Sequence, residues 1–344
     1  MSQFRNLIFE GGGVKGIAYV GAMQVLEKKK ILKDIRRVGG TSAGAINAVL
    51  TACGFTNEEQ LKILATMDFN RFMDDSFGFL RDADRLLKEF GWHKGDFFRE
   101  WIGSLIAQKL GSPNATFTDF QLAGRPDIYL VGANLSTGFG EIFSTEHTPT
   151  MRVLDAVRIS MSLPLFFAAI RNTRGDVFVD GGLLDNYPIK MFDRAKYVDN
   201  KKAGIQTKYY QDENAKFLTG AYKNRSPYVY NAETLGFRLD SKREIAAFRY
   251  GNVEVARKID DFFDYTKALL MTALNAQEAM HLHSDDWQRT IYIDTLGVGT
   301  TDFDLTSKTK NDLVKSGKEH TQAYFDWFEK ASKDAPPANR VETR

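Results

Sequence analysis

The sequence of 344 residues predicts an α/β protein with a mostly parallel central sheet and helices on both faces. Strand-like runs alternate with helical patterns through the first half of the chain. Three glycine-rich turns, at residues 11–16, 40–44 and 181–182, each follow a predicted strand. Because ligands of open α/β sheets bind at the carboxyl ends of strands, functional residues are expected at these turns.

Short apolar runs bounded by turn residues predict strands at residues 5–9, 35–38, 127–133, 141–144 and 176–179. Helices are predicted at residues 16–30 and 45–53. The first of these carries Ile17, Val20, Val25 and Leu26 on one side, and the second is rich in alanine. Strand and helix therefore alternate up to the second glycine-rich turn.

Residues 55–110 predict a helical insertion that contains the aromatic cluster Phe69, Phe72, Phe77 and Phe79. The favoured interpretation is a helical subdomain that buries these rings. The alternative is a lid or a lipid-facing lip, since exposed aromatic clusters suit an interface.

The second half of the chain is less regular. Residues 201–240 are polar and rich in tyrosine, which predicts a long surface excursion. Residues 254–330 predict C-terminal helices, at 254–285 and 313–328, with a strand at 289–294 between them. Residues 335–344 lack apolar periodicity and predict a disordered tail. With no repeat or clear linker, residues 1–334 are interpreted as one catalytic domain.

Composition narrows the class of protein. The chain is 43% hydrophobic and 26% charged, and its formal net charge of +2 provides no electrostatic case for nucleic acid. The single cysteine, Cys53, excludes an internal disulfide and any multi-cysteine metal site. No signal peptide or membrane span is recognisable, so a cytoplasmic protein is expected, with transient contact at a membrane surface left open. The oligomeric state stays undetermined.

Gly40-Thr41-Ser42-Ala43-Gly44 has the Gly-x-Ser-x-Gly pattern of a nucleophile elbow. It lies between a predicted strand and a predicted helix, as such an elbow requires. Gly40 and Gly44 allow backbones to pass closely, and the helix N-terminus favours developing negative charge. Ser42 is therefore the candidate nucleophile, although the pattern also arises by chance.

A serine nucleophile needs a base, and none of the five histidines lies in a glycine-framed turn at a strand end. Asp180-Gly181-Gly182 does lie in such a turn. A buried carboxylate beside the hydroxyl can accept its proton, which predicts a Ser42–Asp180 dyad. The simpler alternative is a tight turn in which Asp180 only caps a helix.

The third turn, Gly11-Gly12-Gly13-Val14-Lys15-Gly16, opens a helix, so its N–H groups can converge on an anion. Next to a serine nucleophile it would be an oxyanion hole, and Lys15 would add charge near a substrate phosphate. The loop also fits the dinucleotide pattern Gly-x-Gly-x-x-Gly. That interpretation needs an acidic residue after the second strand, where none occurs; Asp34 precedes this strand. The loop is also not a P-loop, because it has no Gly-Lys-Ser/Thr after the required four-residue gap.

These three motifs, in this order, resemble the patatin-like phospholipase family. The glycine loop resembles its oxyanion motif, Gly40–Gly44 its nucleophile elbow, and Asp180-Gly181-Gly182 its base motif. Residues 160–166, 234–239 and 294–298 are similar to further segments of family members, so the resemblance spans about residues 5–330.

The resemblance implies a three-layer α/β/α sandwich and hydrolysis of acyl esters in phospholipids or related lipids, without a metal or other cofactor. Ser42 and Asp180 would be catalytic, and Gly11, Gly12, Gly13 and Ala43 would form the oxyanion hole. Gly16, Gly40, Gly44, Gly181 and Gly182 would shape the turns. Two alternatives stay open: a broad carboxylesterase or thioesterase, and a non-catalytic lipid-binding protein.

Overall fold

The computed structural model describes residues 3–72, 88–240 and 285–330, together with residues 86, 259–260, 265, 268–269 and 272. The helix expected over residues 254–285 lies almost entirely outside this part of the chain. Phe77, Phe79 and the tail expected at residues 335–344 lie outside it altogether.

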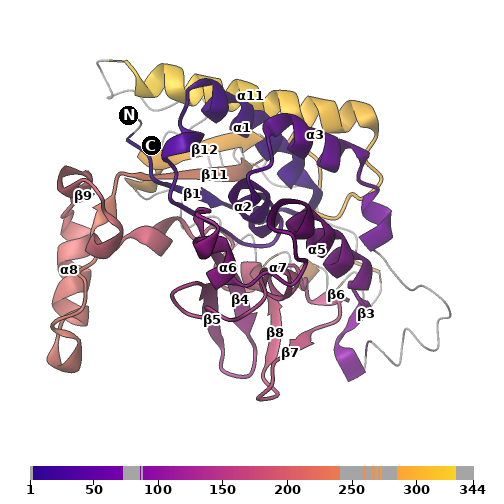
Figure 1. Cartoon of the computed structure of the whole chain (residues 1–344), viewed down its shortest axis with the longest axis horizontal. Coiled ribbons are helices and arrows are strands. Elements are labelled where there is room, and N and C mark those ends of the chain that lie inside the picture. Colours follow the sequence, from indigo (N-terminus) through magenta and orange to yellow (C-terminus); the bar gives the residue numbers. More distant parts are fainter. Residues whose placement is uncertain are drawn as a thin grey trace.

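A mixed sheet forms the centre of the molecule (Figure 1), in the order β12-β11-β1-β2-β4-β8-β7, with β5 on the other edge of β4. Its strands are β1 (Asn6–Phe9), β2 (Arg37–Gly40), β4 (Asp127–Asn134), β5 (Phe139–Ser144), β7 (Ile170–Arg171), β8 (Val177–Asp180), β11 (Thr234–Asp240) and β12 (Thr290–Asp294). The five strands from β12 to β4 are parallel, whereas β5 and β8 run antiparallel to β4. The mostly parallel α/β fold is confirmed.

Most of the helices pack around the sheet, whereas α8 projects away from it (Figure 1). The described helices are α1 (Ala18–Lys28), α2 (Ala43–Cys53), α3 (Asn57–Thr66), α5 (Asp96–Leu110), α6 (Phe117–Leu122), α7 (Val153–Ser160), α8 (Lys208–Phe217) and α11 (Ser307–Phe328). The main hydrophobic core joins alternate residues of the central strands to α1, α2, α3, α5, α7 and α11. A smaller cluster, around Ile8, Tyr129 and Phe192, contains the other alternate residues of β1 and β4.

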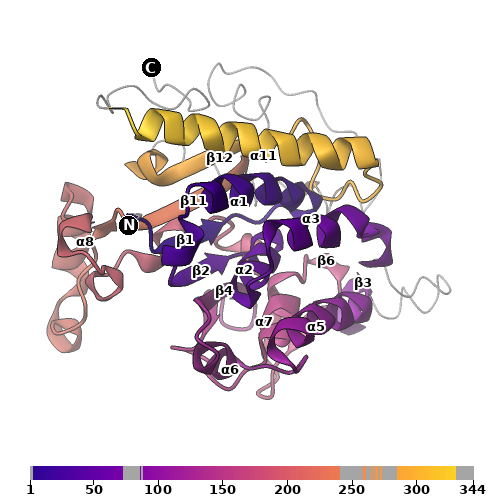
Figure 2. The same cartoon turned by 45° about the horizontal axis from the view of Figure 1, so that its top comes forward.

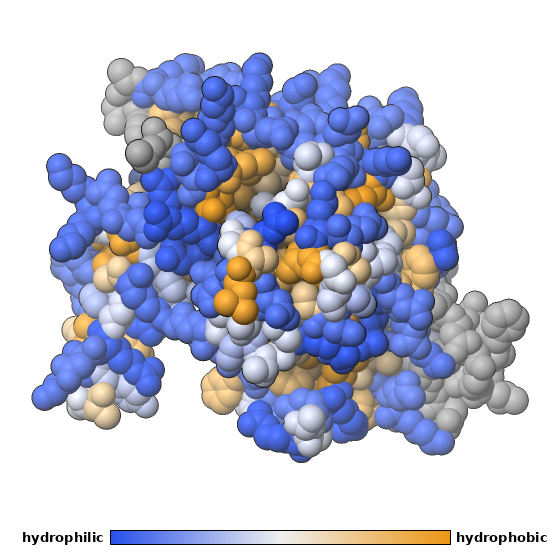
Figure 3. Space-filling model, in the orientation of Figure 1, coloured by the Kyte–Doolittle hydropathy of each residue, from blue (hydrophilic) through white to orange (hydrophobic). Residues whose placement is uncertain are grey.

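The helices α1 and α11 lie along each other (Figure 2) and cross at two glycines. A Cβ atom on Gly21 would lie 1.8 Å from the Val314 carbonyl oxygen, and one on Gly317 would lie 1.9 Å from that of Ala18. Any side chain at these glycines would push the helices apart. Polar residues on the outer side of α11 face solvent, within a largely hydrophilic surface (Figure 3).

The structure corrects the prediction for residues 201–240. Only part of this stretch, around α8, projects from the body of the molecule (Figure 1). Its last residues form β11, a fully buried strand between β1 and β12. Its two charged residues, Arg238 and Asp240, form a buried ion pair, with Arg238 Nη2 2.7 Å from Asp240 Oδ1.

The aromatic cluster at residues 69–79 is partly described. Phe69 and Phe72 are buried, and the Phe72 ring lies 5.3 Å from that of Phe98 in α5. These two rings therefore face protein and not lipid. The stretch 55–110 also includes a short strand, β3 (Gly91–His93), which pairs with β6 (Leu165–Phe167).

Candidate active site

Ser42 occupies a strained turn between β2 and α2. Its φ of 54° and ψ of −122° lie in a region that residues other than glycine rarely adopt. The glycines on either side are required by packing: a Cβ atom on Gly44 would lie 2.2 Å from the Phe9 carbonyl oxygen, and one on Gly40 would lie 2.5 Å from the Gly44 carbonyl carbon. The chain therefore has the geometry of a nucleophile elbow, with the half-buried Ser42 at the N-terminus of α2.

The strands β2 and β8 meet end to end on one edge of β4. Gly40 of β2 pairs with Leu130, whereas Asp180 of β8 pairs with Gly132. The other edge of β4 is occupied by β5, so β2 and β8 share the remaining edge. Because β2 is parallel to β4 and β8 is antiparallel, their carboxyl ends face each other. This topology brings Ser42 and Asp180 together across 138 residues of sequence.

Two acceptors lie within reach of the Ser42 hydroxyl. One is the carboxylate of Asp180, which the meeting ends of β2 and β8 place beside Ser42; burial raises the pKa of this carboxyl, and the Ser42 side chain opposes the rise as a hydrogen-bond donor. The other is Met161 Sδ, 3.7 Å from Ser42 Oγ. The backbone N–H of Ser42 donates to Ser160 Oγ at 3.0 Å. The end of α7 therefore lies directly against the turn.

Asp180 is buried, with 3% of its surface exposed. Burial raises its pKa to about 7, against the opposing effects of hydrogen bonds from Gly182 N–H and Ser42. The Gly182 N–H donates to Asp180 Oδ1 at 2.7 Å, so Asp180 also caps the short 3-10 turn η4 (Gly181–Leu183). The carboxylate thus has both positions considered from the sequence: it caps a turn and it contacts Ser42.

The glycine loop follows β1 and leads into the 3-10 turn η1 (Gly13–Ile17). The expectation for Gly11 is corrected, because its N–H donates to the Asn186 carbonyl at 3.0 Å and is not available to an oxyanion. Within the described part of the chain, the N–H groups of Gly12, Gly13 and Ala43 have no protein acceptor. These three are the remaining candidates for the oxyanion hole.

Lys15 does not have the place expected of a substrate-facing cation. Only 7% of its surface is exposed, and Nζ donates to the Leu239 carbonyl at 3.4 Å. Two motif glycines allow close packing: a Cβ atom on Gly16 would lie 3.1 Å from that of Ala43, and one on Gly181 would lie 2.4 Å from the Val131 carbonyl oxygen.

The segment after η4 joins the three turns, a role that the sequence did not reveal. The Asn186 side-chain amide donates to the Gly11 carbonyl at 3.3 Å, which completes a two-way contact between these residues. The Thr41 hydroxyl donates to the Asp185 carbonyl at 2.9 Å. Neither Asp185 nor Asn186 belongs to a sequence motif. Only their positions, five and six residues after Asp180, could have directed attention to them.

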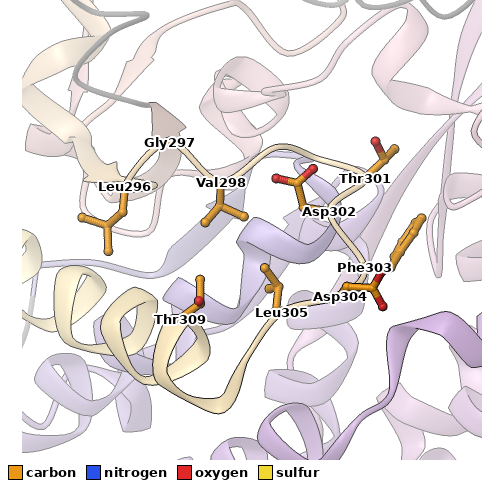
Figure 4. Close-up of a pocket in the computed structure, with 9 residues that line it drawn as sticks. All are labelled: Leu296, Gly297, Val298, Thr301, Asp302, Phe303, Asp304, Leu305 and Thr309. Carbon is orange, nitrogen blue, oxygen red and sulfur yellow. The ribbon is translucent and has the colours of Figure 1, made fainter.

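A pocket of about 540 Å³ lies where β12 is joined to α11 (Figure 4). It is formed by the loop between β12 and α11 and by the start of α11, and its lining residues are Leu296, Gly297, Val298, Thr301, Asp302, Phe303, Asp304, Leu305 and Thr309. The same loop contacts the glycine loop, since Val14 N–H donates to the Thr300 carbonyl at 3.2 Å. The Phe303 ring lies 5.3 Å from that of Phe166.

The three histidines that the structure describes contact residues other than Ser42. His147 Nδ1 lies 2.8 Å from Ser144 Oγ, His320 Nδ1 lies 2.9 Å from the Ser316 carbonyl, and the His93 ring lies 4.7 Å from that of Phe166. Where the structure describes the chain, no three His, Cys, Asp or Glu residues are grouped to hold a metal ion. The described helices include none with the length and apolar character of a membrane span.

The sheet, the serine turn and the buried Asp180 together define an α/β protein with a candidate Ser–Asp site at the carboxyl ends of its strands. The family model of patatin-like phospholipases matches residues 7–193, which is more than half of the chain and includes all three motifs. The chain belongs to the patatin-like phospholipase family.

The chain is similar to several known proteins. YqhO of Bacillus subtilis (strain 168), an uncharacterized protein, is 29% identical over 333 residues, which cover 92% of this chain and 97% of YqhO. The cGAMP-activated phospholipase of Pseudomonas aeruginosa (strain BWHPSA011 / Pa011) is 29% identical over 194 residues, so the match spans 54% of each protein. VipD from Legionella pneumophila shares the fold, with a TM-score of 0.61 and 17% identity over 94% of this chain and 67% of VipD.

Proposed function

We propose that the protein is a lipid acyl hydrolase of the phospholipase A or lysophospholipase type, which cleaves carboxylic esters through Ser42 and Asp180. One observation carries the proposal: the ends of β2 and β8 meet on one edge of β4, which places the buried carboxylate of Asp180 beside a serine in a strained turn, and burial raises the pKa of this carboxyl to about 7. A serine hydroxyl is a weak nucleophile unless a base accepts its proton, and a base works best with a pKa near the operating pH.

In the first half of the reaction, Asp180 takes the proton of the Ser42 hydroxyl as Oγ attacks the ester carbonyl carbon. The oxyanion that forms is held by N–H groups of Gly12 and Gly13, with Ala43 as a third donor. One such donor contributes roughly 10²–10³ in rate. The carbonyl then re-forms, the proton from Asp180 passes to the leaving alcohol oxygen, and an acyl-serine is left.

In the second half, water attacks the acyl-serine while Asp180 accepts a proton from it. The same N–H groups hold the second oxyanion, and the fatty acid leaves as Ser42 regains its proton. The N-terminus of α2 supports both steps, because its positive end lies beside the developing charge.

The substrate class comes from the family and its relatives, which include a phospholipase. We propose a phospholipid or another acyl-ester lipid as substrate, reached by transient contact with a membrane surface. A broad carboxylesterase or thioesterase would use the same residues and is the alternative. A non-catalytic lipid-binding protein is disfavoured, because it would have no need of a strained serine beside a buried carboxylate.

Ser42→Ala and Asp180→Asn test the proposal on a short-chain nitrophenyl ester and on phospholipid vesicles. Each variant is expected to lose at least about 10³-fold in turnover while remaining folded, because removal of a nucleophile or its base stops the first step. Ser104→Ala, at an exposed position, and Asp176→Asn, at a half-buried position in the turn between β7 and β8, are the matched controls. Near wild-type turnover in either test variant would show that the dyad is wrong.

Product analysis with purified wild type and Ser42→Ala then separates the substrate classes. Release of fatty acid and lysolipid from vesicles supports a phospholipase. Turnover of soluble esters alone supports a carboxylesterase or thioesterase. Failure of a fluorophosphonate probe to label Ser42 in the wild type would favour the non-catalytic alternative.

A further inference from the structure

The edge of β11 that faces β1 changes its partner at Leu239. The strand β1 ends at Phe9, which lies opposite Phe237, and the next residue, Glu10, donates its N–H to the Phe237 carbonyl at 3.1 Å. Leu239 lies two residues farther along β11 and presents its N–H and C=O to the same edge, since strand geometry repeats every second residue. There β1 no longer runs alongside, because the chain has turned into the glycine loop.

Two side chains that flank the three glycines replace the missing strand. Glu10 Oε2 accepts the N–H of Leu239 at 2.7 Å, and Lys15 Nζ donates to the carbonyl of Leu239 at 3.4 Å. Both side chains are buried, with 1% of Glu10 and 7% of Lys15 exposed. Glu10 directly precedes the glycines and Lys15 closely follows them. The two ends of the loop therefore hold the same residue, one by its donor and one by its acceptor.

We propose that Glu10 and Lys15 are positioning residues that hold the glycine loop in its oxyanion-binding conformation through Leu239. The inference rests on the proposed function, since it assigns the loop's N–H groups to the oxyanion. Three consecutive glycines restrict the backbone weakly, so restraint has to come from outside them. Hydrogen bonds to charged groups are among the strongest restraints available.

Glu10 and Lys15 together form a clamp on Leu239, and the contacts around this clamp agree with the proposal. A Cβ atom on Gly12 would lie 2.8 Å from Leu239 Cδ1, so the loop also packs on the side chain of Leu239. The negative charge of Glu10 is balanced by Arg238, whose Nε lies 3.5 Å from Glu10 Oε1. The Glu10 carbonyl accepts the Tyr19 hydroxyl at 2.7 Å, which fixes the start of the loop against α1.

Amide hydrogen exchange of residues 11–16 tests the clamp without reference to activity. Lys15→Met keeps the apolar stem and removes the ammonium, and we expect exchange in the loop to become about 10- to 100-fold faster. Lys15→Arg should restore part of the protection. Lys310→Met is the matched control, because Lys310 Nζ also donates to a backbone carbonyl, that of Met67 at 2.7 Å. Unchanged loop exchange in folded Lys15→Met would overturn the clamp.

Steady-state kinetics on a neutral nitrophenyl ester test the link to catalysis. For Lys15→Met we expect kcat to fall about 10- to 100-fold while KM stays within about twofold, since the loop acts on the transition state. Lys310→Met should keep wild-type kcat. An unchanged kcat on the neutral ester, with a raised KM only on anionic phospholipid, would show that Lys15 binds substrate directly, and the positioning role would be wrong.

Two further outcomes are distinguishable. If the wild type hydrolyses no ester and no fluorophosphonate labels Ser42, the proposed function fails, whereas the exchange result still decides whether the clamp exists.

If Lys15→Met does not fold, Glu10→Gln replaces it as the test variant. This variant keeps an acceptor for Leu239 N–H but loses the charge, and we expect exchange in the loop to rise about two- to fivefold. Unchanged exchange in this variant would overturn the proposal.

Discussion

Asp180, the last residue of β8, lies opposite Gly132 of β4, two positions past the residue of β4 that faces the end of β2. Gly132 has no room for a side chain: a Cβ atom there would lie 2.7 Å from the ring of Phe143 and 2.8 Å from Cγ2 of Ile159. The end-to-end arrangement of β2 and β8 places a buried carboxylate beside Ser42. Its consequences for activity and stability can be measured.

The first prediction concerns the pH dependence of activity. Asp180 has to be ionised to accept the Ser42 proton, and burial raises its pKa to about 7. The value of kcat/KM should therefore rise about tenfold per pH unit below pH 7 and level off above it. Initial rates on a nitrophenyl ester between pH 5 and pH 9, corrected with Ser42→Ala, measure this. A flat profile from pH 5 to pH 8 would contradict a base with this pKa.

The second prediction concerns stability, which should fall as pH rises, whereas activity should increase. Between the ordinary pKa of 3.8 and about 7, folded Asp180 holds a proton that the unfolded chain has released. Stability contributed at low pH is therefore lost as pH rises, by about 1.4 kcal/mol per pH unit in this window. Asp180→Asn lacks this loss and should gain stability relative to wild type from pH 4 to pH 7.

Urea denaturation of both proteins at several pH values measures the difference in free energy of unfolding. Asp176→Asn is the control: a hydrogen bond from Asn172 lowers the pKa of Asp176, so this carboxylate contributes no loss of stability as pH rises from 4 to 7. If the difference in the free energy of unfolding between wild type and Asp180→Asn does not change with pH, the Asp180 carboxylate is already ionised in the folded protein at low pH.

The third prediction concerns the elbow. Gly44→Ala places a methyl group 2.2 Å from the Phe9 carbonyl oxygen, so β1 and α2 have to separate. We expect a loss of roughly 1–3 kcal/mol or more in stability, with a large loss of turnover. Gly140→Ala is the matched control, because nothing lies within 4 Å of its Cβ position and its φ is not positive. Thermal unfolding compares them, and equal melting temperatures would contradict the packing described for the turn.

The fourth prediction concerns a buried ion cluster at the start of β12. Arg289 binds both oxygens of Asp193 at 2.6 Å and Asp286 Oδ1 at 2.6 Å, and all three side chains are buried. Arg289→Met leaves two buried carboxylates without this cation and should cost about 3–5 kcal/mol. Arg174→Met removes an exposed cation that pairs with Asp176 and should cost less than about 1 kcal/mol. Similar denaturation midpoints for the two variants would refute the difference.

Local patterns predicted several parts of the molecule correctly. The strands that precede the three glycine-rich turns, and the helices that follow the first two, lie within a few residues of their expected positions. The turns were recognisable because glycine spacing, apolar runs and their order are all written within short segments. Family membership followed from the same residues.

Contacts between distant segments were not predicted. The stretch that forms β11 contains Arg238 and Asp240, which look like surface residues until their buried pairing is known. The N–H of Gly11 seemed free for an oxyanion, but Asn186, far along the chain, accepts it. Lys15 seemed ready for a phosphate, but the buried carbonyl of Leu239 lies beside it and accepts a hydrogen bond from its ammonium group.

The sequence by itself determined that a serine turn, a carboxylate turn and a glycine loop each follow a strand, because backbone conformation at glycines and strand ends depends on neighbouring residues. Only the tertiary structure decided that β8 runs antiparallel to β4 and meets β2 end to end. It also decided which loop N–H groups stay without a protein acceptor and raised the pKa of Asp180. Strand direction, hydrogen-bond partners and burial depend on residues that lie far away along the chain, and a local pattern does not contain them.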